Sequence, residues 1–182
     1  MEITDIDQNF NPHAHQAITP ITKKGTSKKT TTEDLQFVEF TLGTECFAIN
    51  LFSTKEVLTP TDITPLPNTP VYIRGVMDLR GTITTIVDLK TLLNISDTGE
   101  GKKKSRIIIL DGDHSEKPIG ILVDDVYSVS THHAVEIERE SENASHTTRF
   151  ILGVIRKNQT SGQKLVLWLD IQKIRESIKN EL

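Results

Sequence analysis

The sequence predicts an all-β fold, in which two small five-stranded β-barrels pack side by side and a short C-terminal helix follows. Three observations lead to this fold. Short runs rich in β-branched residues alternate with Gly, Pro and Asp-Gly clusters, which is typical of strands rather than helices. The order of these runs in the first half of the chain recurs in the second half. Closing the strands of each half into a barrel would remove exposed strand edges.

The first 34 residues are predicted to form a flexible N-terminal tail, because their apolar residues are too scattered to build a buried face. They lack a basic start followed by an apolar run, so no signal peptide is expected. No later run approaches the roughly 20 apolar residues that span a bilayer. The single cysteine, Cys46, is consistent with a reducing compartment, and a reactive thiol is its alternative role. We therefore expect a soluble, cytoplasmic protein with no direct membrane insertion.

The composition also narrows the range of partners. The formal net charge is −4, and only 5% of the residues are aromatic. A negative field repels phosphate backbones, and few rings are available to stack on bases. A nucleic-acid-binding barrel is therefore a disfavoured alternative, and no nucleic acid is expected as a partner.

The first predicted strand, 36–43, shows the period of two that marks a half-buried strand. Val38, Phe40 and Leu42 share one face, which we expect to point at a core, and Glu39 lies on the opposite face. The other predicted strands cover 46–52, 71–79, 82–89, 106–112, 118–129, 150–157 and 164–170.

The connections divide the chain into two halves. Four prolines in 58–71 cannot donate ladder hydrogen bonds and predict a stiff surface crossing. The segments 94–104 and 139–149 are polar and are predicted to be exposed loops. We accordingly expect one barrel over about 35–95 and the other over about 104–170.

A duplicated unit supports this division. Residues 46–57 superpose on 118–129 without a gap, and the strand pairs that follow end in the matched residues Asp88 and Asp170. Two barrels packed together would create a third apolar seam between them. A groove at that seam is where a partner could lie.

The chain is predicted to end in a helix over about 170–181, capped by the carboxylate of Asp170. Its apolar stripe consists of Ile171, Ile174, Ile178 and Leu182. Asp88 and Asp170 also admit an alternative, a barrel hydrolase with paired carboxylates. Helix capping explains both residues, so no catalytic residue is predicted.

Two further polar pairs carry no predicted chemistry. His132 and His133 lie in a polar stretch without Cys or carboxylate residues at ligand spacing, so solvated histidines are expected, with no metal and no cofactor. Asp124 and Asp125 are predicted to end a strand and begin a turn.

The stretch ITPLPNTPVYIRGVMDLRGTITTIVDLKTLL, residues 63–93, resembles the signature of the CheW-like adaptor family of bacterial and archaeal chemotaxis. Further similar stretches extend the resemblance over about 35–178. It implies two five-stranded barrels and a non-catalytic adaptor that couples methyl-accepting chemoreceptors to the histidine kinase CheA. It also implies recruitment to receptor arrays at the inner face of the membrane. Another protein-interaction module of this fold, in a two-component pathway, is the alternative.

The resemblance assigns receptor contact to Arg80, in the motif Asp78-Leu-Arg-Gly. The family usually has Asn in place of Asp78, and Pro in place of Thr85, so a charge sits beside the arginine. Arg80 could instead be a structural clamp on Asp78 or on the neighbouring loop.

Four further residues are assigned to receptor contact. Thr54 and Val57 lie in the segment that, in the family, lines the docking seam, and Val129 is the counterpart of Val57 in the second repeat. The alternative is that both valines are core residues. Gly75 would permit a close backbone approach or an unusual turn. Contact with the kinase is assigned to the hairpins around Phe47 and Ile119, the corresponding apolar ends of the two barrels.

Overall fold

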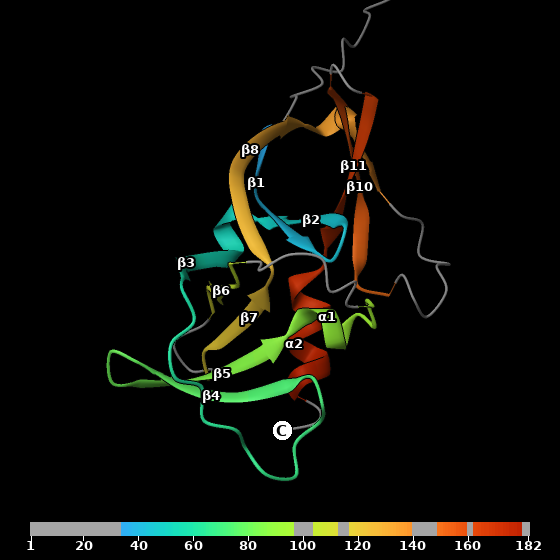
Figure 1. Ribbon diagram of the computed structural model, residues 1–182. Helices are drawn as coiled ribbons and strands as arrows, with labels where there is room; N and C mark the ends of the chain where they lie inside the picture. Colours follow the sequence, from blue (N-terminus) through green and yellow to red (C-terminus); the bar gives the residue numbers. More distant parts are fainter. Residues whose placement is uncertain (1–33, 97–103, 113–116, 140–148, 160–161, 180–182) are drawn as a thin grey trace, which may run out of the picture. The chain divides into compact units, whose positions relative to one another are not determined.

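The computed structural model describes residues 34–96, 104–112, 117–139, 149–159 and 162–179 (Figure 1). Eleven strands, two α-helices and two short 3-10 helices (η) are formed in this part of the chain. In chain order they are β1 (Asp34–Leu42), β2 (Glu45–Asn50), η1 (Leu51–Ser53), β3 (Thr54–Leu58), β4 (Ile73–Leu79), β5 (Thr82–Asp88), α1 (Leu89–Leu92), β6 (Arg106–Leu110), β7 (Ile119–Val123), β8 (Asp125–His133), η2 (Ala134–Glu136), β9 (Ile137–Arg139), β10 (Ile151–Gln159), β11 (Gly162–Leu169) and α2 (Ile171–Lys179).

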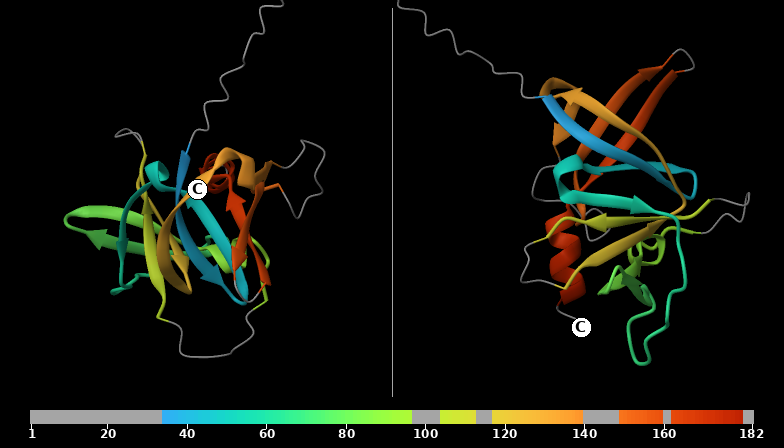
Figure 2. Two further views of the ribbon diagram at one scale, coloured as in Figure 1. Left: turned by 90° about the horizontal axis from the view of Figure 1, so that it is seen from above. Right: turned by 90° about the vertical axis from the view of Figure 1, so that its left-hand side faces the viewer.

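The strands form two sheets, which confirms the all-β prediction. The six-stranded sheet has the order β8-β1-β2-β11-β10-β9, and the five-stranded sheet has the order β3-β6-β7-β5-β4. Figures 1 and 2 show the six-stranded sheet curling around an interior that β8 and β10 face from opposite sides. The sixth strand is the three-residue β9, which pairs only with β10.

The two halves of the chain exchange strands, so the predicted division into barrels at 35–95 and 104–170 is wrong. β1 and β2, from the first half, complete the sheet of the second half. β6 and β7, from the second half, complete the sheet of the first half. In each half the chain crosses from one sheet to the other after its first two strands, so the third strand, β3 or β8, pairs with the first strand of the other half, β6 or β1.

The predicted repeat is confirmed strand by strand. Val57 pairs with Ile108 and Val129 pairs with Val38, so the two valines occupy equivalent positions. Both third strands carry a bulge at the same point, before Glu56 in β3 and before Ser128 in β8. The parallel pairs β5–β7 and β11–β2 are likewise equivalent.

Three apolar clusters hold the fold together. One lies within the six-stranded sheet, around Phe37 and Trp168, and another within the five-stranded sheet, around Met77 and Ile86. The third and largest joins the two sheets and includes residues of both, such as Phe40 and Ile121, together with α2. This cluster is the predicted apolar seam.

β1 is buried on both faces, whereas a half-buried strand was predicted. Val38, Phe40 and Leu42 belong to the seam, as expected for the core-facing side. On the other face, Phe37 and Glu39 are fully buried inside the six-stranded sheet. A curled sheet has an interior of its own, and the second sheet covers its outer face, so both faces of β1 are buried from Phe37 to Phe40.

Both predicted helix caps are present. The Asp88 carboxylate accepts a hydrogen bond from the Thr91 amide at 3.2 Å, at the start of α1. The Asp170 carboxylate accepts from the Gln172 and Lys173 amides at 3.0 and 3.1 Å, at the start of α2. The apolar stripe of α2 lies in the seam through Ile171, Ile174 and Ile178, and the fourth predicted stripe residue, Leu182, lies outside the described residues.

Other predicted segments are only partly described. Of the predicted tail, residues 1–33 lie outside the described residues, and Asp34 already belongs to β1. Most of the loops at 94–104 and 139–149 also lies outside them. The proline-rich crossing before β4 is tied down by a bridge between Thr64 and Val76. In the described part of the chain, no helix has the length and apolar character needed to cross a membrane.

Candidate protein-binding site

Val57 and Val129 are exposed on edge strands, on the face of each sheet that looks towards the other sheet. Their cross-strand partners, Ile108 and Val38, both belong to the seam cluster. Side chains of paired residues project to the same face of a sheet. Val57 is 40% exposed and Val129 is 59% exposed. The alternative that both valines are core residues is therefore wrong. Val57 and Val129 form the exposed apolar edge of the seam on β3 and β8, which we call the seam margin.

Arg80 is held by Glu56 of β3. Glu56 pairs with Ile109 of the cluster inside the five-stranded sheet, so it projects to the face of β3 opposite to Val57. The Arg80 guanidinium donates to both carboxylate oxygens, at 3.0 and 3.3 Å, while the Arg80 side chain stays 75% exposed. Arg80 has a φ of +53°, because it occupies the tight turn between β4 and β5. The predicted clamp on Asp78 is not formed, since the Asp78 carboxylate instead accepts from the Gly81 amide at 2.6 Å.

Thr54 begins β3 and is half-buried at the same margin. Among the described residues, its hydroxyl is buried without a hydrogen-bond partner. Thr54, Val57 and Arg80 thus lie on or beside one edge strand, together with Glu56. Thr54 and Val57 lie on the seam face of this strand and Arg80 lies at its other face, while Val129 occupies the position equivalent to Val57 in the other sheet.

Gly75 is buried in β4, and its role is structural. Its φ is +138°, and a Cβ there would lie 2.1 Å from the Thr64 carbonyl oxygen. The crossing segment approaches the backbone at this point, where the Thr64 and Val76 amides and carbonyls exchange hydrogen bonds of 2.8 Å. Gly75 lets this segment pack against β4, and its burial leaves no side-chain surface for a partner.

Phe47 and Ile119, assigned to the kinase, are both buried in the seam, with exposures of 2% and 4%. The hairpins were expected to present them at the ends of the barrels. Because the halves exchange strands, β2 and β7 are inner strands of their sheets and face the other sheet. The prediction that these two residues contact a partner directly is therefore corrected.

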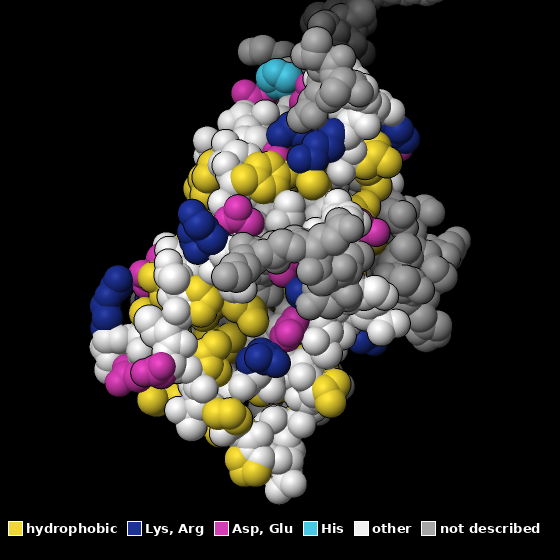
Figure 3. All heavy atoms as spheres, viewed as in Figure 1, with side chains coloured by type: hydrophobic (Ala, Val, Ile, Leu, Met, Phe, Trp, Pro, Cys, Tyr) yellow, Lys and Arg dark blue, Asp and Glu magenta, His cyan; other side chains and the backbone are white. Residues whose placement is uncertain are grey.

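The five-stranded sheet carries an exposed apolar surface that sequence patterns did not single out. Leu66, Val71 and Ile83 are 36%, 86% and 61% exposed. Leu66 and Ile83 line a cavity of about 430 Å³ together with Lys117 and others. Figure 3 shows apolar side chains gathered over this sheet. The sequence pattern of β5 does not set Ile83 apart from the buried residues of the strand. Its exposure to solvent is therefore visible only in the structure.

A polar cluster fills the interior of the six-stranded sheet, centred on the fully buried Glu39. The Lys157 ammonium donates to both Glu39 oxygens, at 2.8 and 2.9 Å, and the Ser130 hydroxyl also bonds to Glu39. His132 Nε2 lies 3.2 Å from Glu39, and His132 Nδ1 lies 3.3 Å from Glu136. The expectation of a solvated histidine is wrong for His132, which is 6% exposed.

Burial alone would raise the pKa of Glu39. Hydrogen bonds from Lys157, Ser130 and His132, together with the Lys157 charge, outweigh burial and lower the pKa of Glu39 to about 2. Glu39 is therefore ionised, and it ties β1 to β8 and β10 across the interior of the sheet.

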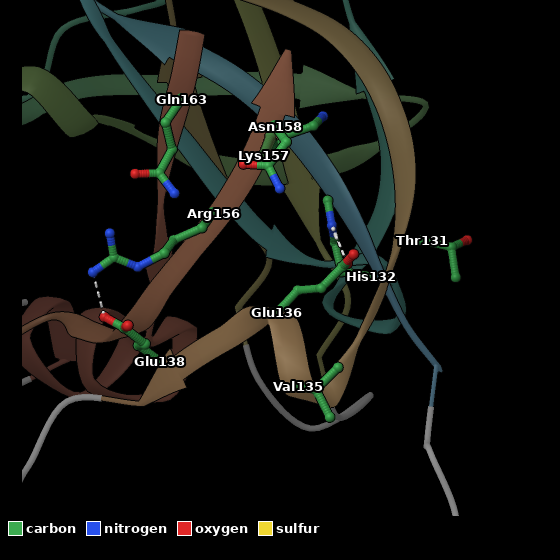
Figure 4. A pocket seen from close by; sticks show the side chains of 9 residues that line it. All are labelled: Thr131, His132, Val135, Glu136, Glu138, Arg156, Lys157, Asn158 and Gln163. Carbon is green, nitrogen blue, oxygen red and sulfur yellow. Dashed lines mark hydrogen bonds and ion pairs between the residues drawn. The ribbon is translucent and has the colours of Figure 1, made fainter.

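The mouth of this cluster opens into a cavity of about 490 Å³, which includes His132, Glu136, Arg156 and Lys157 in its walls (Figure 4). Arg156 pairs with Glu138 at 2.7 Å, and this pairing lowers the pKa of Glu138 and raises that of Arg156.

Ser130, His132 and Glu136 lie in a row that is similar to a hydrolase triad, with 3.0 Å between the Ser130 hydroxyl and His132. The same hydroxyl bonds to the Glu39 carboxylate, which is a weak base because its pKa is about 2. Asp88 and Asp170 are engaged as helix caps. No group of three or more metal-ligating side chains occurs within the described ranges. The arrangement links β1, β8 and β10 across the interior of the sheet.

Residues 36–179 match the model of the CheW-like domain. The chain belongs to the CheW-like family.

CheW-like relatives are similar to this chain over most of their length. The chemotaxis protein CheW of Thermotoga maritima is 30% identical over 148 residues, which cover 80% of this chain and 91% of the relative. CheW of Klebsiella aerogenes is 29% identical over 143 residues, covering 78% and 82%. The crystal structure of the scaffolding protein TtCheW from Thermoanaerobacter tengcongensis superposes with a TM-score of 0.66 at 29% identity, covering 76% of this chain and 90% of that one. These relatives support a role as a chemotaxis adaptor.

Proposed function

We propose that this CheW-like chain is a non-catalytic adaptor that binds a chemoreceptor tip and the regulatory domain of CheA at the same time. The observation that carries the proposal is the seam margin, where apolar side chains of two edge strands stand exposed, with an ion-paired arginine at the opposite face of β3. The proposal places the protein in the cytoplasm, recruited to receptor arrays at the inner face of the membrane.

The receptor tip docks at the seam margin. A helical hairpin needs an apolar floor with polar groups at the rim. Val57 and Val129 supply the floor, and Arg80 supplies a rim charge whose guanidinium keeps free donors after pairing with Glu56. Asp78 stays engaged with the turn, so the charge beside Arg80 does not compete for its guanidinium.

The kinase domain docks on the apolar surface around Leu66 and Ile83, because Phe47 and Ile119 are buried. This surface lies on β5 and the crossing segment, whereas the receptor margin lies on β3 and β8. Separate surfaces permit simultaneous binding. The adaptor then holds receptor and kinase in one assembly, so that a shift in the receptor can bias the kinase between its states.

The test measures binding of each partner separately, with purified chain and either a receptor cytoplasmic fragment or the CheA regulatory domain. Arg80→Glu is expected to weaken receptor binding at least about tenfold and to leave kinase binding unchanged. Arg156→Glu is the matched control, because Arg156 is also exposed and paired with a glutamate, on the other sheet. Equal receptor affinity of the wild-type and Arg80→Glu proteins would contradict this assignment.

A charge exchange separates the two roles of Arg80. In the double variant Glu56→Arg with Arg80→Glu, the ion pair is restored with reversed polarity. If Arg80 only clamps β3, receptor binding returns to the wild-type level. If its guanidinium contacts the receptor, binding stays weak, which is the result the proposal expects.

A further inference from the structure

We infer that Phe52, on the link between the two sheets, is an anchor side chain that determines how this protein engages the helical partner at the seam margin. This inference rests on the proposed function and deepens it. Phe52 is not among the residues that the sequence analysis assigned to partner contact.

The ring of Phe52 points into solvent and does not contribute to the packing of the described residues. It is 79% exposed, and it is the most exposed aromatic side chain in the described part of the chain. The other exposed aromatic residue, Tyr127, is 41% exposed and has the Lys164 ammonium 4.7 Å from its ring centre. Within the described ranges, no ring or cation contact is formed by Phe52. Exposed aromatic rings are the side chains most enriched at binding hot spots.

The backbone under Phe52 is rigid. The Asn50 side chain accepts a hydrogen bond from the Phe52 amide at 2.8 Å. The Thr54 amide donates to the Leu51 carbonyl, and the Asp111 amide donates to the Ser53 carbonyl at 2.9 Å. These bonds fix η1 at both ends and tie it to the end of β6. A partner that takes the ring would therefore not have to order the loop that carries it.

The second repeat shows what this position does when it serves the fold. The equivalent of Phe52 is Asp124, which is 5% exposed. Its carboxylate accepts from the Gly43 amide at 2.6 Å and pairs with the Lys90 ammonium at 2.9 Å. Its amide donates to the Thr41 carbonyl at 3.1 Å. In the second repeat this position thus forms buried hydrogen bonds and an ion pair, whereas in the first repeat it carries a solvent-exposed phenyl ring.

The place of η1 in the chain, directly before β3, favours the receptor as the partner of Phe52. η1 leads from β2 of one sheet directly into β3 of the other, and β3 carries Thr54, Glu56 and Val57 of the receptor margin. The ring therefore stands two residues before Thr54, where the chain crosses between the sheets and the strand that carries the proposed floor begins. A surface helix with an apolar stripe offers holes between its i and i+4 side chains, and a phenyl ring fits such a hole as a knob.

The experiment compares the affinity of a purified receptor cytoplasmic fragment for the wild-type chain, Phe52→Ala and Phe52→Leu. Phe52→Ala is expected to weaken binding at least tenfold, about 1.4 kcal/mol, and Phe52→Leu less, because it keeps an apolar knob. Val135→Ala is the matched control, since Val135 is 78% exposed on η2. Binding of the CheA regulatory domain and the urea midpoint should be the same in all four proteins.

The outcomes are distinguishable. Unchanged receptor affinity of Phe52→Ala overturns the inference and leaves the proposed function standing. An equal loss in Val135→Ala also overturns it, because the effect would then be unspecific. If the wild-type chain itself does not bind the receptor fragment, the proposed function fails and the inference falls with it.

Discussion

Replacing Lys157 by Met tests whether the polar cluster inside the six-stranded sheet stabilises the fold. The substitution keeps most of the length of the side chain and removes the ammonium that donates to Glu39 at 2.8 and 2.9 Å. Glu39 is fully buried, so its charge would keep only the hydrogen bonds of Ser130 and His132. Removing one partner of a buried ion pair typically costs about 3–5 kcal/mol of stability.

The pKa of Glu39 gives a second measure of the same effect. A pKa held at about 2 in the folded chain, against 4.5 ordinarily, corresponds to about 3 kcal/mol of stability. Because the folded-state pKa is lowered, this stability is present above about pH 5 and is lost as the pH falls towards 2. The difference between wild type and Lys157→Met should therefore be largest near pH 7 and should shrink on acidification.

Urea unfolding provides the assay, followed by the fluorescence of Trp168. This residue is the only tryptophan of the chain, and it packs edge-on against Phe37 inside the same sheet, with ring centres 5.2 Å apart. Arg156→Met is the matched control, because Arg156 lies next to Lys157 on β10 but pairs with the exposed Glu138. A loss below about 1 kcal/mol in Lys157→Met, or a loss that does not depend on pH, would refute the reasoning.

Two further predictions concern stability. Gly75→Ala should cost about 3 kcal/mol of stability, because the added Cβ would clash with the Thr64 carbonyl. Gly81→Ala should cost only about 1 kcal/mol, since Gly81 has a φ of +83° but open space around it. Equal urea midpoints for the two variants would contradict this prediction. Asp88→Ala and Asp170→Ala should each cost about 1 kcal/mol through the lost cap, with receptor and kinase binding retained. Loss of a hydrolytic reaction from a fully stable Asp170→Ala protein would instead support the hydrolase alternative.

Much of the fold could be predicted because its signals are local. The strand runs, the two helix-capping aspartates and the close approach at Gly75 each depend on a few neighbouring residues. The repeat also gave the equivalence of Val57 and Val129, which the strand register confirms. The pairing of β1 with β8 could not be predicted, since alternation within a strand does not specify which strand it pairs with.

The candidate site shows the same division. Burial of Phe47 follows from the strand exchange, so its contact with a partner was misjudged when each half was taken as its own barrel. Glu39 looked like a solvent-facing residue because a single strand does not reveal partners such as Lys157, which lies 118 positions further along the chain.

The exchange of strands has a consequence for how such a protein can be divided. Cutting the chain between α1 and β6 would give two fragments, each with β-hairpins but neither with a complete sheet. Either fragment alone could satisfy its open strand edges only by associating with a second copy of itself or with the other fragment. We therefore expect the covalent chain to unfold in a single transition, and the two fragments to regain the native circular dichroism only when they are mixed.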